Sequence, residues 1–208
     1  MSWSIDMHDT DGMNDRVNAL RQAVKTAADK GILLFCANPD KGQGYENKTY
    51  PFCLDTERVF CIGAAKDGHP YSQIDTTNDK TDLYLPGVNI PFKVKSTYNS
   101  SKIKVERPPE TWDRYSGSSL SCALAAGLAA TILHCARISG VSEAERLWLK
   151  TSIGMREVFN SLHRAPSGWL PVEKVFGNSS LVNAANHKER RTALKDVVDT
   201  LLSKCPKA

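Results

Sequence analysis

Ile32-Leu33-Leu34-Phe35-Cys36-Ala37 is an unbroken run of six apolar residues, and Asn38-Pro39-Asp40-Lys41-Gly42 follows it directly. An apolar run of this length, without polar alternation, is typical of a strand that is buried on both faces. Such strands occur mainly in parallel sheets that helices cover on both sides. The segment therefore predicts a central strand in a layered α/β domain.

The segments around this run support the same fold class. Residues 14–29 predict a helix, because their apolar side chains recur every three or four positions and Gly31 follows as a stop signal. Val59–Ala64 is a second strand-length apolar run, and Asp82–Leu85 is a shorter one that ends at Pro86-Gly87. Alternating strands and helices indicate right-handed parallel crossovers. We therefore expect a mostly parallel sheet with helices on both faces.

The second half of the chain predicts helices around a polar excursion. Residues 91–113 are basic and contain prolines, which favours a surface loop. Residues 116–137 predict a turn that enters a helix of small apolar residues. Ser142–Glu145 fits a capping box, and one helix behind it would carry Leu147, Leu149, Ile153 and Phe159. Residues 192–204 predict a last amphipathic helix.

Composition excludes several classes of protein. The 208 residues are 41% hydrophobic and 24% charged, which argues against a disordered, collagenous or coiled-coil chain. No apolar run approaches 18 residues, so we expect no transmembrane helix and no membrane partner. The first residues resemble neither a signal peptide nor a transit peptide. The composition favours an intracellular protein, although the compartment remains unassigned.

Charged residues and cysteines do not form a recognisable binding motif. The formal net charge is +4, and the basic residues are scattered, so we expect no nucleic-acid partner. None of the six cysteines has the Cys-x-x-Cys spacing of zinc or redox sites. Four of them lie in apolar segments and are expected to act as small buried hydrophobic residues: Cys36, Cys61, Cys122 and Cys135.

Two places on this scaffold could carry chemistry. Asn38 directly follows a buried strand, and Gly117-Ser118-Ser119 directly precedes a long helix. A serine at a helix N-terminus lies beside free backbone N–H groups, which suit an oxyanion. The alternative is structural: Ser118 or Ser119 would be a helix N-cap, and Asn38 would form an Asx-turn.

The order of these segments resembles the C-terminal part of a subtilisin-like serine protease. Gly117-Ser118-Ser119-Leu120-Ser121-Cys122-Ala123-Leu124-Ala125-Ala126-Gly127 aligns without a gap with the family motif GTSMASPHVAG. Four residues are identical to the motif: Gly117, Ser119, Ala126 and Gly127. Leu85-Pro86-Gly87-Val88 is similar to another family segment, in which an apolar residue precedes Pro-Gly-Val. The seven substitutions within the motif indicate a divergent branch of the family.

The resemblance implies a function and a set of site residues. Ser119 would be the nucleophile, and Asn38 would donate to the oxyanion. Ser2, Trp3, Ser4, Cys36 and Ala37 would bind the substrate backbone. The expected activity is a serine endopeptidase with peptide or protein substrates, no cofactor and no metal. We divide the chain into a partial peptidase domain, residues 1–165, and a C-terminal extension with an amphipathic helix, residues 166–208.

The expected protease lacks two of its three catalytic residues in this sequence. In the family the chain order is Asp, His, Ser, and both partners precede the strand that Met1–Ile5 resembles. We therefore expect a domain that is truncated at its N-terminus and inactive alone, whose longer parent chain would carry further domains. Two alternatives remain open. One is a non-catalytic binding module with a degenerate protease fold, and the other is an unrelated α/β domain.

Overall fold

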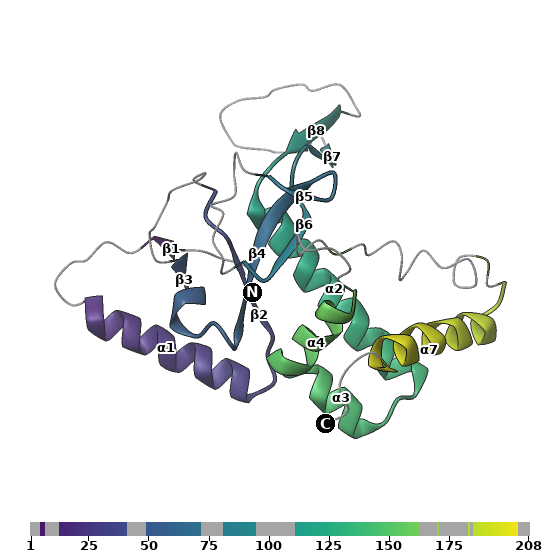
Figure 1. Cartoon of the computed structure of the whole chain (residues 1–208). Coiled ribbons are helices and arrows are strands. Elements are labelled where there is room, and N and C mark those ends of the chain that lie inside the picture. Colours follow the sequence, from purple (N-terminus) through teal and green to yellow (C-terminus); the bar gives the residue numbers. More distant parts are fainter. Residues whose placement is uncertain are drawn as a thin grey trace, which may run out of the picture.

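A computed structural model describes residues 5–6, 13–40, 49–71, 81–94, 111–162, 170, 183 and 185–203 (Figure 1). Its central sheet contains β2 (Leu34–Ala37), β4 (Val59–Lys66), β5 (His69–Pro70) and β6 (Leu83–Pro86). The three longer strands are parallel: β4 lies between β2 and β6, with Cys36 opposite Cys61 and Ile62 opposite Leu83. The short β5 turns back antiparallel along the end of β4. The predicted parallel pairing of the two apolar runs is confirmed.

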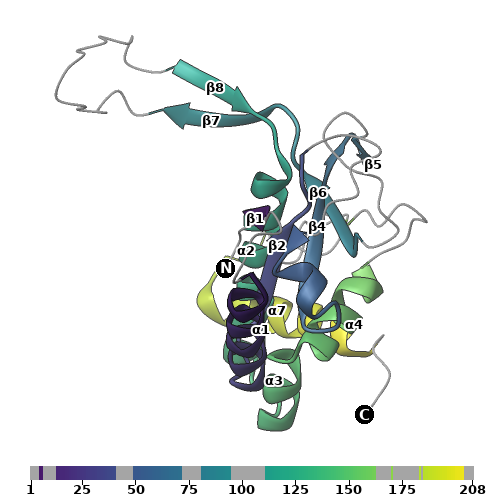
Figure 2. The same cartoon turned by 90° about the vertical axis from the view of Figure 1, so that its left-hand side faces the viewer.

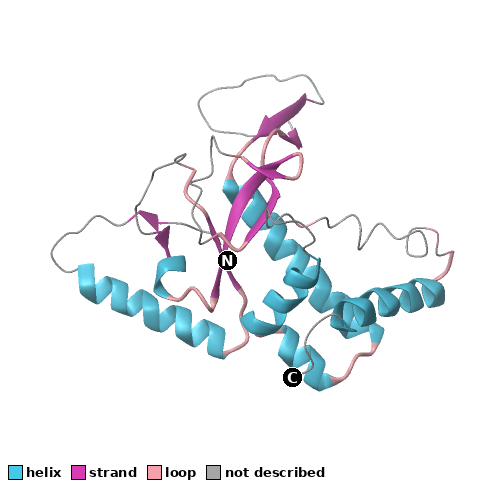
Figure 3. Cartoon of the chain, viewed as in Figure 1, coloured by secondary structure: helices cyan, strands magenta, loops and turns pink. Residues whose placement is uncertain are grey.

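Helices cover both faces of this sheet (Figure 3). On one face lie α2 (Ser118–Ser139) and α4 (Ser152–Leu162), which pack on alternate side chains of the strands. Phe35 and Phe60 stack on neighbouring strands, with ring centroids 4.9 Å apart, and Phe159 of α4 meets Phe60 edge-on. Burial of three aromatic rings makes this face the main hydrophobic core.

The opposite face is smaller and is covered by α1 (Met13–Asp29). Val24 of this helix packs against Leu34 and Cys36 of β2 and against Val59 and Cys61 of β4. All four cysteines predicted to be buried are buried, and Cys53, which lies in the 3₁₀ helix η1 (Phe52–Leu54), is exposed. The helices on both faces confirm the predicted α/β class.

The long helix α2 connects the sheet to the C-terminal part of the chain. It contacts β2, β4 and β6, and it also packs against α7 (His187–Ser203). By length and composition alone, α2 is long and apolar enough to cross a membrane. The absence of long unbroken apolar runs in the sequence did not predict this. Here its apolar side chains, among them Leu128 and Ile132, lie in the main core. Val197, Val198 and Leu201 of α7 belong to the same core.

The segment after α2 forms two helices instead of the predicted single helix. The capping box is confirmed, because the Ser142 hydroxyl accepts from the Glu145 N–H and begins α3 (Glu143–Leu149). The chain then turns, and the Thr151 hydroxyl accepts from the Gly154 N–H at the start of α4. Because of this break, Leu147 and Ile153 are exposed, whereas Leu149 and Phe159 are buried.

Two short antiparallel pairs lie outside the central sheet. β1 (Ile5–Asp6) pairs with β3 (Thr49–Tyr50). The ends of the predicted surface loop form β7 (Ile90–Val94) and β8 (Thr111–Tyr115), so the loop prediction is wrong at both ends. Their cross-strand pair Phe92–Tyr115 packs edge-on, at 5.7 Å between ring centroids. This hairpin projects from the sheet end at which α2 begins (Figure 2).

Candidate active site

The two segments singled out in the sequence meet at the carboxyl end of the parallel strands. The Ser118 hydroxyl donates to the Asn38 carbonyl across 80 positions of sequence. The helix begins at Ser118 with Gly117 as its N-cap residue and no side-chain cap bond, so neither serine is the N-cap. The structural alternative for these serines is therefore wrong. The Ser118 hydroxyl instead ties the start of α2 to the end of β2.

Asn38 is held rigidly at this junction. Its side chain is 3% exposed, and its backbone N–H donates to the Ile62 carbonyl at 2.8 Å, which extends the β2–β4 pairing by one residue. Its Nδ2 donates to Thr81 Oγ1 at 3.2 Å. Both the backbone and the amide of Asn38 are therefore fixed by neighbouring strands. The structure places Asn38 beside Ser118, the residue that precedes Ser119 in the chain.

Asp40 also belongs to this junction, and the sequence reasoning missed it. Its carboxylate oxygens accept from the Ser118 N–H at 2.9 and 3.1 Å. Those bonds satisfy a backbone donor at the helix start and place a negative charge where the helix dipole favours it. The signal for Asp40 was its position three residues after a buried strand, but its partner is 78 residues away.

Two glycines and Ser121 permit this close packing. The Gly117 N–H donates to the Gly87 carbonyl at 2.7 Å, and the Ser121 hydroxyl donates to the carbonyls of Leu85 and Pro86. A Cβ added at Gly87 would lie 2.2 Å from Ser121 Oγ and 3.0 Å from the Gly117 carbonyl oxygen. Because no side chain fits there, the Pro-Gly pair that ends β6 allows α2 to contact the sheet.

Ser119 points away from this packed junction. Its side chain is exposed, whereas Ser118 and Ser121 on either side are buried. The hydroxyl borders an open hollow of about 350 Å³, which is also lined by Phe92, Tyr115, Ser116 and Leu120. Ser119 is therefore accessible to a bound molecule, next to an apolar surface that the β7–β8 hairpin provides.

Among the described residues, no hydrogen bond joins a histidine to Ser119. His134 lies fifteen residues along α2, roughly 22 Å away at the rise of an α-helix. His69 is in β5 and His187 begins α7, and no hydrogen bond joins either to the junction. His8 and His163 lie outside the described residues. Within the described part of the chain, no group of three or more His, Cys, Asp or Glu could hold a metal ion.

The remaining predicted substrate-binding residues fall into two groups. Ser2, Trp3 and Ser4 lie outside the described residues. Cys36 and Ala37 are 0% and 5% exposed, so both residues are buried in this structure and their predicted contact with a substrate backbone stays a prediction. Burial raises the pKa of the Cys36 thiol to about 12, which keeps this thiol neutral and unreactive.

A family model identifies the family of this chain. The family model described as the subtilase family, Peptidase_S8, matches residues 1–188. Among curated proteins, the major intracellular serine protease of Bacillus subtilis (strain 168) is 32% identical over 77 residues. That match covers 36% of this chain and 24% of the Bacillus protein.

Solved structures share the fold at low sequence identity. A lanthipeptide protease superposes with a TM-score of 0.57 at 15% identity, covering 88% of this chain and 56% of its own. The patellamide maturation protease PatA gives 0.54 at 19% identity, covering 98% and 61%. The chain thus spans little more than half the length of these solved proteins and about a quarter of the curated one.

Proposed function

The chain belongs to the subtilase family, and on this premise we propose that it is the nucleophile-bearing part of a serine-type endopeptidase. Peptide or protein substrates would be cleaved by acyl transfer through Ser119. The observation that supports this most directly is the contrast among three neighbouring serines. Ser118 and Ser121 are buried and hydrogen-bonded to the sheet, while Ser119 between them is exposed beside a hollow.

The surroundings of Ser119 suit the stabilisation of an oxyanion. The start of α2 carries the positive end of the helix dipole, and a long helix presents its first N–H groups there. Asn38 lies at the same junction, and its bond to Thr81 fixes the orientation of its amide. In the proposed reaction this amide donates to the tetrahedral intermediate. The Asp40 carboxylate occupies part of the same anion-favouring position, and a substrate would have to compete with it.

A base for Ser119 must come from elsewhere. A serine hydroxyl is a weak nucleophile until a base takes its proton, and none of the described histidines hydrogen-bonds to Ser119. We propose that a histidine and an aspartate are supplied by polypeptide beyond these 208 residues, and that the chain alone does not turn over. The family's structures, which are longer than this chain, are consistent with such a contribution.

The substrate would lie across the exposed end of the site. The proposed contacts are backbone pairing with residues 2–4, the backbone of Cys36 and Ala37, and the hollow beside Ser119. Phe92 and Tyr115 would offer that hollow's aromatic surface to an apolar substrate side chain. These assignments remain predictions. The alternative, a non-catalytic binding module, uses the same surface without hydrolysis and is favoured by the distance of His134 from Ser119.

A fluorophosphonate probe tests the proposal, because it labels a serine only when a base activates it. The chain should be compared with a longer polypeptide extended by the in-frame sequence encoded upstream of Met1. We expect Ser119 to be labelled in the longer polypeptide and not in the 208-residue chain. Ser119→Ala should abolish labelling, while Ser116→Ala, which alters another serine of the same hollow, should retain it.

Three results would contradict parts of this proposal. Labelling of the 208-residue chain at Ser119 would disprove its inactivity. Labelling that survives Ser119→Ala would disprove the nucleophile. A longer polypeptide that folds but is neither labelled nor hydrolytic would support the non-catalytic alternative over the endopeptidase.

A further inference from the structure

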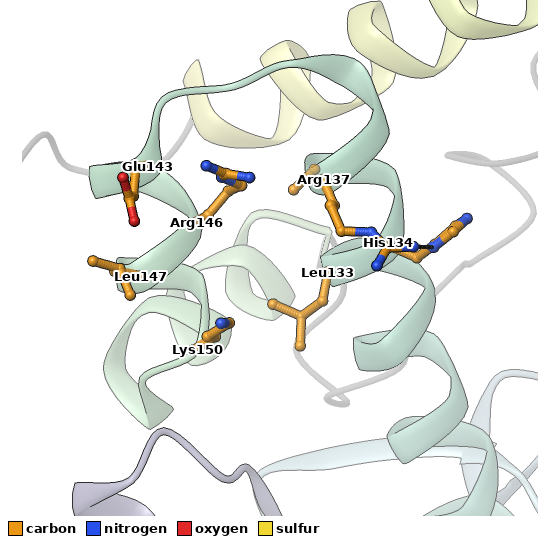
Figure 4. Close-up of a pocket in the computed structure, with 8 residues that line it drawn as sticks. Leu133, His134, Arg137, Glu143, Arg146, Leu147 and Lys150 are labelled. Carbon is orange, nitrogen blue, oxygen red and sulfur yellow. Dashed lines mark hydrogen bonds between the residues drawn. The ribbon is translucent and has the colours of Figure 1, made fainter.

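A groove separates the last turns of α2 from α3, at the opposite end of α2 from Ser119 (Figure 4). Its volume is about 500 Å³, within the usual range of ligand sites. The α2 wall carries Leu133, His134, Ala136 and Arg137, and the α3 wall carries Glu143, Arg146, Leu147 and Lys150. At the rise of an α-helix, Leu133 lies roughly 21 Å from Ser119, so this groove is separate from the candidate active site.

Arg146 is the most unusual residue of the groove. Its Nε is buried and has no hydrogen-bond partner among the described residues. Figure 4 shows its side chain reaching from α3 into the space beside α2. A buried guanidinium N–H without an acceptor is costly, and buried donors are usually paired. The Arg146 guanidinium therefore keeps donor capacity that the described residues do not use, and carboxylates bind guanidinium groups strongly.

The charges around Arg146 favour an anionic partner. Arg137 and Lys150 contribute two more cations, and Glu143 contributes the only carboxylate among the lining residues. No ion pair joins Glu143 to any of these cations within the described part of the chain. Arg137 Nη2 contacts His134 Nδ1 at 3.4 Å on α2.

The rest of the groove is apolar. Leu147 is 56% exposed at its rim, and Leu133 points from α2 toward α3. Ala136 is buried at its base. A simple inorganic anion would leave these side chains uncovered, whereas an acidic segment with apolar residues would cover them and also neutralise the cations. Grooves between helices commonly bind such amphipathic segments.

We propose that the groove between α2 and α3 is a docking site for an acidic, leucine-bearing peptide segment of a partner protein. Carboxylates of the segment bind Arg146, with Lys150 and Arg137 as flanking cations, and its apolar side chains cover Leu133 and Leu147. This interaction is independent of the proposed endopeptidase activity.

Fluorescence anisotropy of a labelled amphipathic peptide tests the proposal on the full 208-residue chain. The probe is a twelve-residue peptide of leucine and glutamate. We expect Arg146→Gln and Lys150→Gln each to weaken binding about tenfold, as for the loss of one charge-assisted hydrogen bond. Leu147→Ser should weaken it about threefold through lost apolar contact. Lys188→Gln is the matched control: it removes one positive charge from exposed α7 and should change affinity less than twofold.

Two further peptides distinguish the possible occupants. A glutamine-for-glutamate analogue should bind at least tenfold more weakly, and so should a serine-for-leucine analogue. If the serine analogue or inorganic phosphate binds as well as the probe, the groove is a simple anion site and the proposal is wrong. Equal affinities of the wild type, Lys150→Gln and Leu147→Ser would also overturn it. The last two variants alter exposed side chains, so the result does not depend on whether Arg146→Gln folds.

Discussion

The two ends of α2 differ in how their polar groups are satisfied. At its start, Ser118 and Ser121 donate to carbonyls of Asn38, Leu85 and Pro86, and Asp40 accepts from the backbone. At its end, the Arg146 Nε beside the helix is buried without a partner, and Leu147 is largely exposed. The first end is completed by the chain's own strands, whereas the second is not completed by the described residues. The same helix therefore has one end whose polar groups are paired within the chain, called here the paired end, and one end where a buried donor is left without a described partner.

Among these substitutions, one at Gly87 should destabilise the packing between the start of α2 and β6 most strongly. In Gly87→Ala the new Cβ would lie 2.2 Å from Ser121 Oγ and 2.7 Å from Ala64 Cβ. The Gly117 carbonyl oxygen would lie 3.0 Å away as well, and these short groups leave little room to relax, so we expect the free energy of unfolding to fall by about 3 kcal/mol. Urea unfolding followed by circular dichroism measures this change. A loss below about 1 kcal/mol would show that α2 is not packed so tightly against β6.

Ser121→Ala should cost less than the glycine substitution. It removes the hydroxyl that donates to the Leu85 and Pro86 carbonyls in a fully buried position. We expect a loss of about 1–2 kcal/mol, because buried carbonyls would lose a donor. Thr131→Ala is the matched control on the same helix, since its hydroxyl is exposed and bonds only to the Gly127 carbonyl. Equal losses in both variants would contradict the special role of Ser121.

Asp40→Ala tests whether the carboxylate stabilises the start of α2. It removes the acceptor for the Ser118 N–H together with a favourable charge at the helix N-terminus. We expect a loss of about 1 kcal/mol, typical of a missing helix cap. Thermal unfolding at matched ionic strength measures it. If stability does not change, the bond between Asp40 and α2 is not formed in solution.

Gly127→Ala should have a small effect of the opposite sign. An added Cβ there meets nothing within 4 Å, in contrast to Gly87. Alanine favours a helix over glycine by roughly 1 kcal/mol, so we expect stability to rise by up to that amount. A loss of stability would indicate that another surface packs on this face of α2 in the folded protein.

The carboxyl of Asp82, at the amino end of β6, should make the stability of the folded protein depend on pH. Burial raises the pKa of this carboxyl above its ordinary value of 3.8, and the Cys61 N–H and Arg156 oppose the shift only partly. Because the folded state holds the proton more tightly, the stabilising contribution is complete below pH 3.8 and is lost as pH rises through the raised pKa.

The Asp82→Asn variant cannot titrate at this position and provides the comparison. We expect the wild type to lose stability relative to the variant as pH increases from about 3.5 to 7. Parallel urea unfolding of both proteins across this range measures the difference. A difference that stays constant, or that grows in favour of the wild type, would contradict the raised pKa.

Several features were predictable because their physical cause is local. Ile32–Ala37 and Val59–Ala64 are apolar throughout, which predicts burial on both faces, and the structure pairs Leu34–Ala37 with Val59–Ile62 in parallel. The predicted first strand is wrong at its start, because Ile32 precedes β2 and is 51% exposed. The capping box at Ser142 was visible because both partners lie within four residues. The break between α3 and α4 was not predicted, because Thr151 caps a new helix within a continuous apolar pattern. The β7–β8 hairpin was missed because its strands are separated by a long polar stretch.

The candidate site was only partly predictable for the same reason. Asn38 and Ser119 were identified from a resemblance to family motifs, and their proposed roles remain predictions. Asp40 was missed, since only folding brings its carboxylate to Ser118. The groove between α2 and α3 could not be predicted from the sequence either. Arg137 and Arg146 belong to separate helices, and the charged residues around each of them form no recognisable pattern.

Apolar periodicity and short motifs are properties of neighbouring residues, so they were enough to predict the central parallel strands, the long helices, the α/β class and the family. Only the tertiary structure decided which of the three serines is exposed, which carboxylate caps α2 and which arginine is buried without a partner. Burial and hydrogen bonding depend on what lies opposite a side chain. For Ser118, Ser121 and Arg146, what lies opposite is set by how α2 packs against the sheet and α3.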